Sequence, residues 1–244
     1  MSQNPYSAPL ENSSPQTSPQ MARNRSGYQY KPLNTLAKIL LVSVGLVCFG
    51  NLVISTMEVI GQMLFPGFSD PNAPLNSDLE QYFLFGIAGV GILSLPVFIL
   101  AAVVTAMYFY RANANLHSLG VRGLQHTPGW CAGYWFIPII NLIKPYQVAG
   151  EINNFSRLPS HETPSSSVGL WWTFWIIGNI VSNIESRLAL GGVDMGSTGL
   201  VLSWVSTLLT CAAGFLFIKL VFAFANAQEE LRNASTQPQP TFSP

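Results

Sequence analysis

The polar residues of this sequence that could act inside an apolar environment are gathered in its third long apolar stretch. Asn179, Asn183 and Arg187 recur at intervals of four, and Ser182 lies between them. At 100° per residue these side chains share one arc of a helix, whereas Glu185 lies off it. Polar groups inside a membrane are functional hypotheses by default, because exposing them to lipid is costly. One interpretation makes the two asparagines ligands of a small polar substrate, with Glu185 and Arg187 at the outer mouth.

A packing interpretation of the same stripe is favoured. Gly178, Ser182 and Ser186 form a small-xxx-small pattern that lets helices approach closely, and the asparagines can then hydrogen-bond across the contact. In the next apolar stretch, hydroxyls such as Ser203 and Thr207 recur at helical spacing. They could complete a polar site between the third and fourth helices, although such hydroxyls more commonly bond their own helix.

Other patterns for catalysis or metal binding are missing from the sequence. His117, His126 and His161 form no HExxH motif and have no second ligand at helical spacing. The three cysteines lie far apart and form no CxxC pair, which argues against a zinc site or a disulfide framework. We find no nucleophile–base pair, paired catalytic carboxylates or phosphate loop. The sequence therefore predicts a non-enzymatic protein without cofactor or metal.

The composition is that of a membrane protein. Of the 244 residues, 49% are hydrophobic and only 9% are charged, against about 25% charged in soluble domains. The net charge is zero, so no large basic face invites nucleic acid. Residues 1–34 contain no signal-peptide core, so the first apolar stretch is expected to act as an uncleaved signal-anchor.

Four stretches are long enough to cross a bilayer as helices, since a hydrocarbon core of ~30 Å needs ~20 residues. The expected spans are residues 36–60, 83–110, 169–190 and 198–225. The sequence thus predicts an all-α membrane domain over 34–230, flanked by disordered cytoplasmic tails at 1–33 and 231–244, which are rich in polar residues.

Basic residues set the orientation. Lys and Arg concentrate before the first span, between the second and third, and after the fourth, whereas the opposite side retains only Arg187. By the positive-inside rule both termini are cytoplasmic. If the apolar passage 130–143 crossed the bilayer, Arg111 and Arg122 would lie on the opposite side from Lys144 and Arg157. We therefore expect residues 129–157 to form a cytoplasmic-side segment that re-enters the bilayer or lies along it, and both alternatives stay open.

The aromatic and proline residues of this segment suggest an interaction surface. Tryptophan and tyrosine suit the headgroup region, and Pro138 would interrupt a helix. The leading functional hypothesis is a membrane interaction or scaffold domain that holds another membrane or cytoplasmic protein; the alternative is a carrier or binding protein for a small molecule, ion or lipid. The candidate surface consists of Trp130, Trp135, Phe136, Pro138, Asn141, Lys144, Pro145 and Tyr146.

Two sequence passages resemble a known family. They are Arg-Ala-Asn at 111–113 with Asn115, and Trp-Phe-Ile-Pro at 135–138 followed by Lys-Pro-Tyr-Gln at 144–147 and Glu151. Together with the paired tryptophans at 171–172, they resemble the bacterial membrane-protein family catalogued as domain of unknown function 4328. The resemblance implies a multi-helix domain of the bacterial cytoplasmic membrane, and it supplies no catalytic residue.

Overall fold

The protein is helical throughout the part that its computed structural model describes, which comprises residues 27–65, 68, 77–157, 166–193 and 195–236. That part contains six α-helices and two short 3-10 helices, with no strand. In chain order they are α2 (Asn34–Leu64), α3 (Asp78–Ser118), α4 (Pro128–Gly133), η1 (Tyr134–Phe136), η2 (Ile140–Leu142), α5 (Lys144–Phe155), α6 (Ser166–Leu190) and α7 (Gly196–Thr236). The all-α fold class is confirmed.

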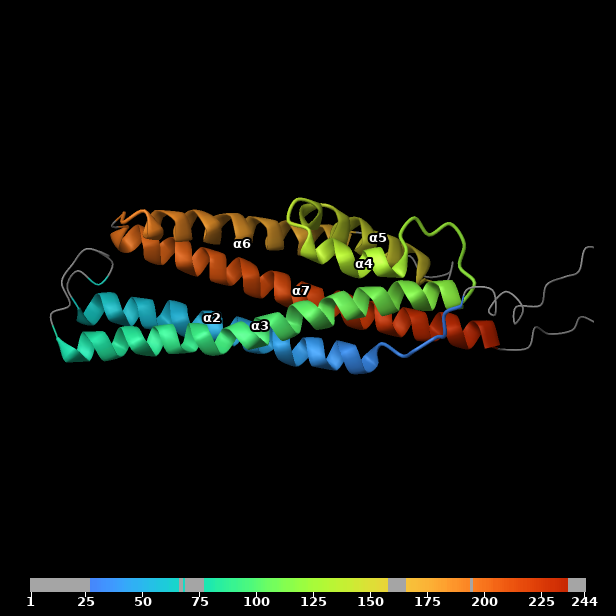
Figure 1. Ribbon diagram of the computed structural model, residues 1–244, viewed down its shortest axis with the longest axis horizontal. Coiled ribbons are helices and arrows are strands. Elements are labelled where there is room, and N and C mark those ends of the chain that lie inside the picture. Colours follow the sequence, from blue (N-terminus) through green and yellow to red (C-terminus); the bar gives the residue numbers. More distant parts are fainter. Residues whose placement is uncertain (1–26, 66–67, 69–76, 158–165, 194, 237–244) are drawn as a thin grey trace, which may run out of the picture.

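The four long helices form an elongated bundle (Figure 1). α2 packs against both α3 and α7, and α7 packs against α6, so that α3 and α6 form the two outer members. α4 and α5 lie over one half of the bundle, near the end of α3 and the beginning of α6 (Figure 1). The start of α2 and the end of α7 lie at this same end of the molecule.

Local sequence explains where α3 begins and ends. The Ser77 side chain accepts a hydrogen bond of 3.1 Å from the backbone N–H of Glu80, a standard N-cap. At the other end Gly120 has φ +78°, and its N–H donates to the carbonyl of His117. The N–H of Val121 donates to the carbonyl of Leu116, which completes a Schellman motif. Gly120 therefore ends the helix.

Glycines allow the long helices to approach one another. A Cβ on Gly178 of α6 would lie 3.3 Å from side-chain atoms of Leu209 and Thr210 on α7. A Cβ on Gly50 of α2 would lie 2.7 Å from the Ser94 hydroxyl of α3. Gly178 thus takes the helix-contact role that the packing interpretation gives it.

Three helices, α2, α3 and α7, are long and apolar enough by composition to cross a membrane. α6 is 25 residues long but is not among these three. The expectation of a fourth span is therefore taken up again below, with the proposed function.

The folded part extends beyond the predicted domain of 34–230. Residues 28–33 run along the bundle as an extended strap, and α7 continues as a helix to Thr236. The strap is held because the backbone N–H and carbonyl of Lys31 both bond the Asn115 side chain. The remaining tail residues, 1–26 and 237–244, lie outside the described residues.

Candidate functional site

The aromatic segment crosses the bundle between α3 and α6. The Trp135 ring of η1 lies 5.4 Å from the Phe109 ring of α3 and 6.5 Å from the Trp172 ring of α6, measured between centroids. The indole N–H of Trp172 donates a 3.1 Å hydrogen bond to the carbonyl of Leu142 in η2. The segment is thus fixed to both outer helices.

Beneath this bridge lies a cavity of about 410 Å³ that all four long helices and the η1–η2 segment line. The volume is within the range of small-molecule sites, which occupy about 300–1,000 Å³. Its walls are mostly apolar: Phe98, Trp171, Trp175, Ala213 and Phe217 are among the lining residues. Among the described residues that line it there is no carboxylate, imidazole or lysine.

Two polar side chains in the wall of this cavity have unused hydrogen-bonding atoms. Trp135 Nε1 and Asn141 Oδ1 are buried, and neither has a hydrogen-bond partner among the described residues. A buried donor or acceptor without a partner costs about 1–3 kcal/mol. Trp135 Nε1 is a donor and Asn141 Oδ1 is an acceptor, so each could bond a polar group that reached it.

Glu151 of α5 fixes the loop that leads into α4. Its carboxylate accepts hydrogen bonds from the backbone N–H groups of Gln125 (2.7 Å) and His126 (3.4 Å) and from the Asn113 side chain (3.4 Å). These donors offset the cost of burying the carboxylate. α4 begins directly afterwards at Pro128, so this contact sets the position of the aromatic segment relative to α3.

Cys131 of α4 packs inside this region with 1% of its surface exposed. Burial, and secondarily the negative charge of Glu151, raises the pKa of its thiol to about 12. A thiol of such a high pKa is a poor nucleophile, because the thiolate is the reactive species. Cys131 therefore acts as a packing residue.

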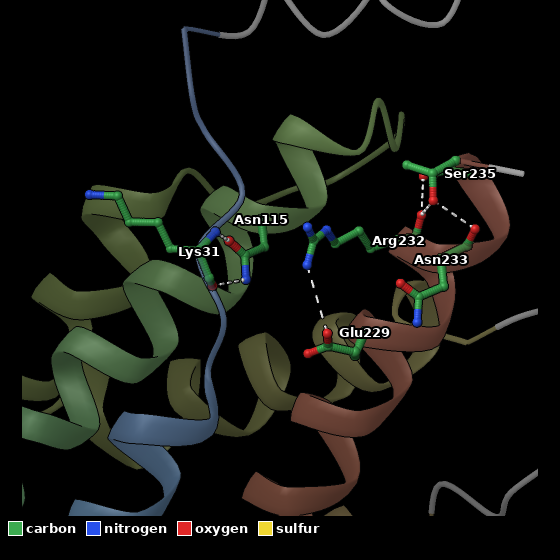
Figure 2. A network of polar contacts seen from close by, with 7 residues as sticks. Lys31, Asn115, Glu229, Arg232, Asn233 and Ser235 are labelled. Atoms are coloured by element: carbon green, nitrogen blue, oxygen red, sulfur yellow. Dashed lines mark hydrogen bonds and ion pairs between the residues drawn. The ribbon is translucent and has the colours of Figure 1, made fainter.

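A buried polar network joins the strap to α3 and α7. Asn115 accepts from the Lys31 backbone N–H (2.9 Å) and donates to the Lys31 carbonyl (2.9 Å) and to Gln228 Oε1 (3.0 Å); Figure 2 shows the strap contact. Gln228 in turn donates to the carbonyl of Ala112 and to the hydroxyl of Ser156. Two of the family-like residues, Asn115 and Glu151, thus have structural partners.

The predicted interaction surface is divided between two faces. Trp130, Phe136 and Tyr146 are exposed, with 64% of Phe136 accessible, and Pro138 is exposed as well. Trp135, Asn141 and Lys144 are half-buried and Pro145 is buried. Trp135 and Asn141 line the cavity and form the inner face of the segment. The sequence analysis did not distinguish this inner face from the exposed outer face.

The predicted polar stripe of α6 faces away from the bundle. Asn179, Ser182, Asn183, Ser186 and Arg187 are all exposed. Asn179 and Asn183 donate to the carbonyls four residues earlier in their own helix, at 2.7 Å each. The structure does not bring them together with the hydroxyls of α7.

Glu185 is half-buried and interacts with the Ser206 hydroxyl of α7. Nearby, the Ser203 hydroxyl donates to Glu58 of α2, and Ser55 lies within hydrogen-bond distance of Ser203 (3.3 Å) and Thr207 (2.8 Å). Sequence reasoning missed Glu58, although an acidic residue within an expected span was a visible signal.

The all-α bundle and its three long apolar helices indicate a multi-pass helical membrane protein. The chain belongs to the family described as Domain of unknown function (DUF4328), which matches residues 84–226. This match confirms the resemblance drawn from the sequence, and it covers the aromatic segment and most of the cavity wall. No curated protein and no solved structure matches the chain.

Proposed function

We propose that this protein binds an amphiphilic small molecule within the membrane and does so without catalysing a reaction. The observation that carries the proposal is the 410 Å³ cavity beneath η1 and η2, with the polar residues Trp135 and Asn141 among those that line it. An apolar cavity with a few convergent polar groups is the usual form of a ligand site. This favours the lipid or small-molecule alternative over a polar site on the asparagine stripe.

The lining defines the ligand by its chemistry. The body of the ligand is apolar, because aromatic and aliphatic side chains such as Phe98 and Phe217 surround it. One group of the ligand both donates and accepts a hydrogen bond, to match Asn141 and Trp135. A long-chain alcohol, a fatty amide or a hydroxylated isoprenoid satisfies both conditions.

The proposal includes four spans with both termini in the cytoplasm. α6 packs along α7 through Gly178, and 25 helical residues extend about 37 Å, enough to cross the hydrocarbon core. Its outer face carries exposed Ile177, Ile180 and Ile184. The Asn179 and Asn183 side chains on that face donate to carbonyls of their own helix, which lowers the cost of placing them in lipid. The basic residues then place the aromatic segment at the cytoplasmic side of a bacterial cytoplasmic membrane.

Photoaffinity labelling tests the proposed ligand site. The probe is hexadecanol carrying a diazirine in its chain, added to the full-length protein in lipid nanodiscs, with labelled peptides identified by mass spectrometry. We expect saturable labelling of the cavity wall near Phe98 and Ala213. Ala102→Phe, which fills the cavity from a half-buried wall position, should reduce that labelling at least tenfold.

Ala223→Phe is the matched control, because Ala223 is exposed on α7 and does not line this cavity. It should leave labelling unchanged. Non-saturable labelling that is spread over the lipid-facing surface, or equal labelling in the two variants, would contradict the proposal.

A second candidate function is interaction with another membrane or cytoplasmic protein. It is favoured by the outer face of the aromatic segment, where Phe136, Ile139, Leu142 and Ile143 are exposed. In a four-span topology this face meets either lipid or a partner. Charge substitution at Ile139, the most exposed of the four residues, should release a partner while leaving labelling of the cavity unchanged.

A further inference from the structure

A second hollow, a groove of about 680 Å³, lies outside the ligand cavity on the other side of α3. The strap forms one wall of the groove, α3 forms its floor, and residues of α4 and η1 close it. Phe136 contributes to both hollows, whereas Trp135 and Asn141 line only the cavity. The groove is therefore a separate site with its own chemistry.

Two cations stand at one end of this groove. Lys31 of the strap and Arg111 of α3 both line it, and no acidic residue of the described part of the chain does. Neither side chain forms an ion pair with a described residue; the ion pair between Arg232 and Glu229 of α7 (Figure 2) involves no residue that lines the groove. The groove therefore presents uncompensated positive charge.

The wall that α3 forms before Arg111 is mostly apolar. Val103, Ala106, Met107 and Tyr110 of α3 line it, and a helix rises about 12 Å between Val103 and Arg111. Tyr110 is the last residue of the expected second span, and Arg111 is the next. Along α3 the lining thus changes from apolar to cationic at the expected membrane surface.

We propose that this groove binds an anionic phospholipid of the cytoplasmic leaflet. The phosphate group lies between Lys31 and Arg111, and an acyl chain runs along Val103 and Met107 toward the bilayer centre. Basic pockets beside transmembrane helices on the cytoplasmic side commonly hold anionic headgroups. Phospholipid matches both ends of the groove, because it joins a negative charge to an apolar chain within one molecule.

Bound lipid would also hold the strap in place. Tyr28 and Lys31 contribute to the groove wall, and the Tyr28 ring lies 5.7 Å from the ring of His117 at the end of α3. This inference rests on the proposed topology and not on the identity of the cavity ligand.

The charges can be removed without removing the contacts that hold the strap. Lys31 bonds Asn115 through its backbone alone, and its side chain is exposed. Lys31→Gln therefore keeps both of those hydrogen bonds. Arg111→Gln likewise removes a half-buried charge that has no ion-pair partner within the described part of the chain.

The test is native mass spectrometry of the full-length, delipidated protein titrated with phosphatidylglycerol or phosphatidylcholine of the same acyl chains. We expect one phosphatidylglycerol to bind preferentially to the wild type. Each substitution should weaken that binding about fivefold, since a cation near a membrane surface contributes about that factor. The double variant should show little preference between the two lipids, with an unchanged melting temperature.

The matched control is Lys38→Gln with Arg122→Gln, which removes two exposed cations that do not line the groove. It should retain the preference. An equal loss in the control, or an unchanged preference in the double groove variant, would overturn the proposal. So would full displacement of the lipid by excess inorganic phosphate, which would indicate a site for a soluble anion.

Two further measurements separate the lipid-groove proposal from the cavity-ligand proposal and from the proposed topology. Ala102→Phe should leave phosphatidylglycerol binding intact, so failure of the cavity proposal leaves this site testable. The lipid titration uses protein in solution, so its result does not depend on the orientation of the protein in the membrane. If phosphatidylglycerol binds preferentially but Gly120 is found on the non-cytoplasmic side, the site is retained and only its assignment to the cytoplasmic leaflet is refuted.

Discussion

At the scale of single residues, Asn115 joins the strap to α3 and α7. Its side chain makes three hydrogen bonds, two part-buried ones to the Lys31 backbone and a buried one to Gln228. We expect Asn115→Ala to lower the free energy of unfolding by about 3 kcal/mol, because each lost bond contributes about 1 kcal/mol. Denaturant unfolding in detergent micelles measures this.

Asn226→Ala is the control for that substitution, since Asn226 is an exposed asparagine on α7. It should change stability by less than about 0.5 kcal/mol. Equal effects of the two substitutions would show that the strap contact adds nothing to stability.

Cys131 gives a pH-dependent prediction. Because its pKa is raised to about 12, the neutral thiol persists to higher pH, and at pH 8 only about one thiol in ten thousand is ionised. Alkylation by iodoacetamide should therefore spare Cys131 at pH 8 in the folded protein and accelerate as the pH rises toward 12. Peptide mass spectrometry measures the modification of each cysteine.

Glu151→Gln is the informative variant for this residue, because it removes the nearby negative charge that contributes to the raised pKa. Alkylation of Cys131 should then begin at a lower pH than in the wild type. Modification at pH 8 as fast as in the unfolded protein would contradict the burial of this thiol.

At the scale of elements, the hydrogen bond from Trp172 to Leu142 holds η2 against α6. Trp172→Phe keeps an aromatic ring but removes the donor. We expect amide hydrogen exchange in residues 140–143 to increase about fivefold, since a typical net hydrogen bond contributes about 1 kcal/mol. Exchange in α5 should not change. An increase throughout α5 as well would mean that the segment opens as one unit.

The sequence predicted the positions of the helices better than which side of each helix contacts its neighbours. Apolar length located the four long helices, because a helix in lipid must satisfy its backbone within itself. Within the expected segment 129–157, Val148 and Ile152 are four residues apart, as on one face of a helix, and both are buried in α5. Periodicity found the stripe of Asn179 and Asn183 but could not show which neighbour it faces. The structure turns it outward, and α6 instead contacts α7 through Gly178.

The cavity was beyond sequence reasoning for a physical reason. Its wall combines single residues from segments far apart in the chain, such as Val44, Phe98, Trp135 and Phe217. The spacing of residues within one helix does not indicate which residues of other helices lie beside them. The sequence did single out Trp135 and Asn141, but as members of an outer surface rather than as polar groups beside a cavity.

At the scale of the whole molecule, the four-span topology makes a prediction for three positions. Reporters inserted after Gly120 and fused after Thr236 should read cytoplasmic, and one inserted after Gly192 should read non-cytoplasmic. The physical reason is the concentration of Lys and Arg on one side, with Arg187 alone on the other. A cytoplasmic signal at Gly192 would mean that α6 does not span and would refute the four-span topology.

The central claim is that the cavity beneath η1 and η2 holds an amphiphile, and one measurement tests it most directly. Native mass spectrometry of the protein released with its surrounding membrane, without detergent, detects what remains bound. We predict one retained small molecule per chain, largely apolar and bearing a hydroxyl or amide group. A chain that carries no small molecule, while a stoichiometric protein partner stays bound, would contradict this account and favour the interaction role of the outer face.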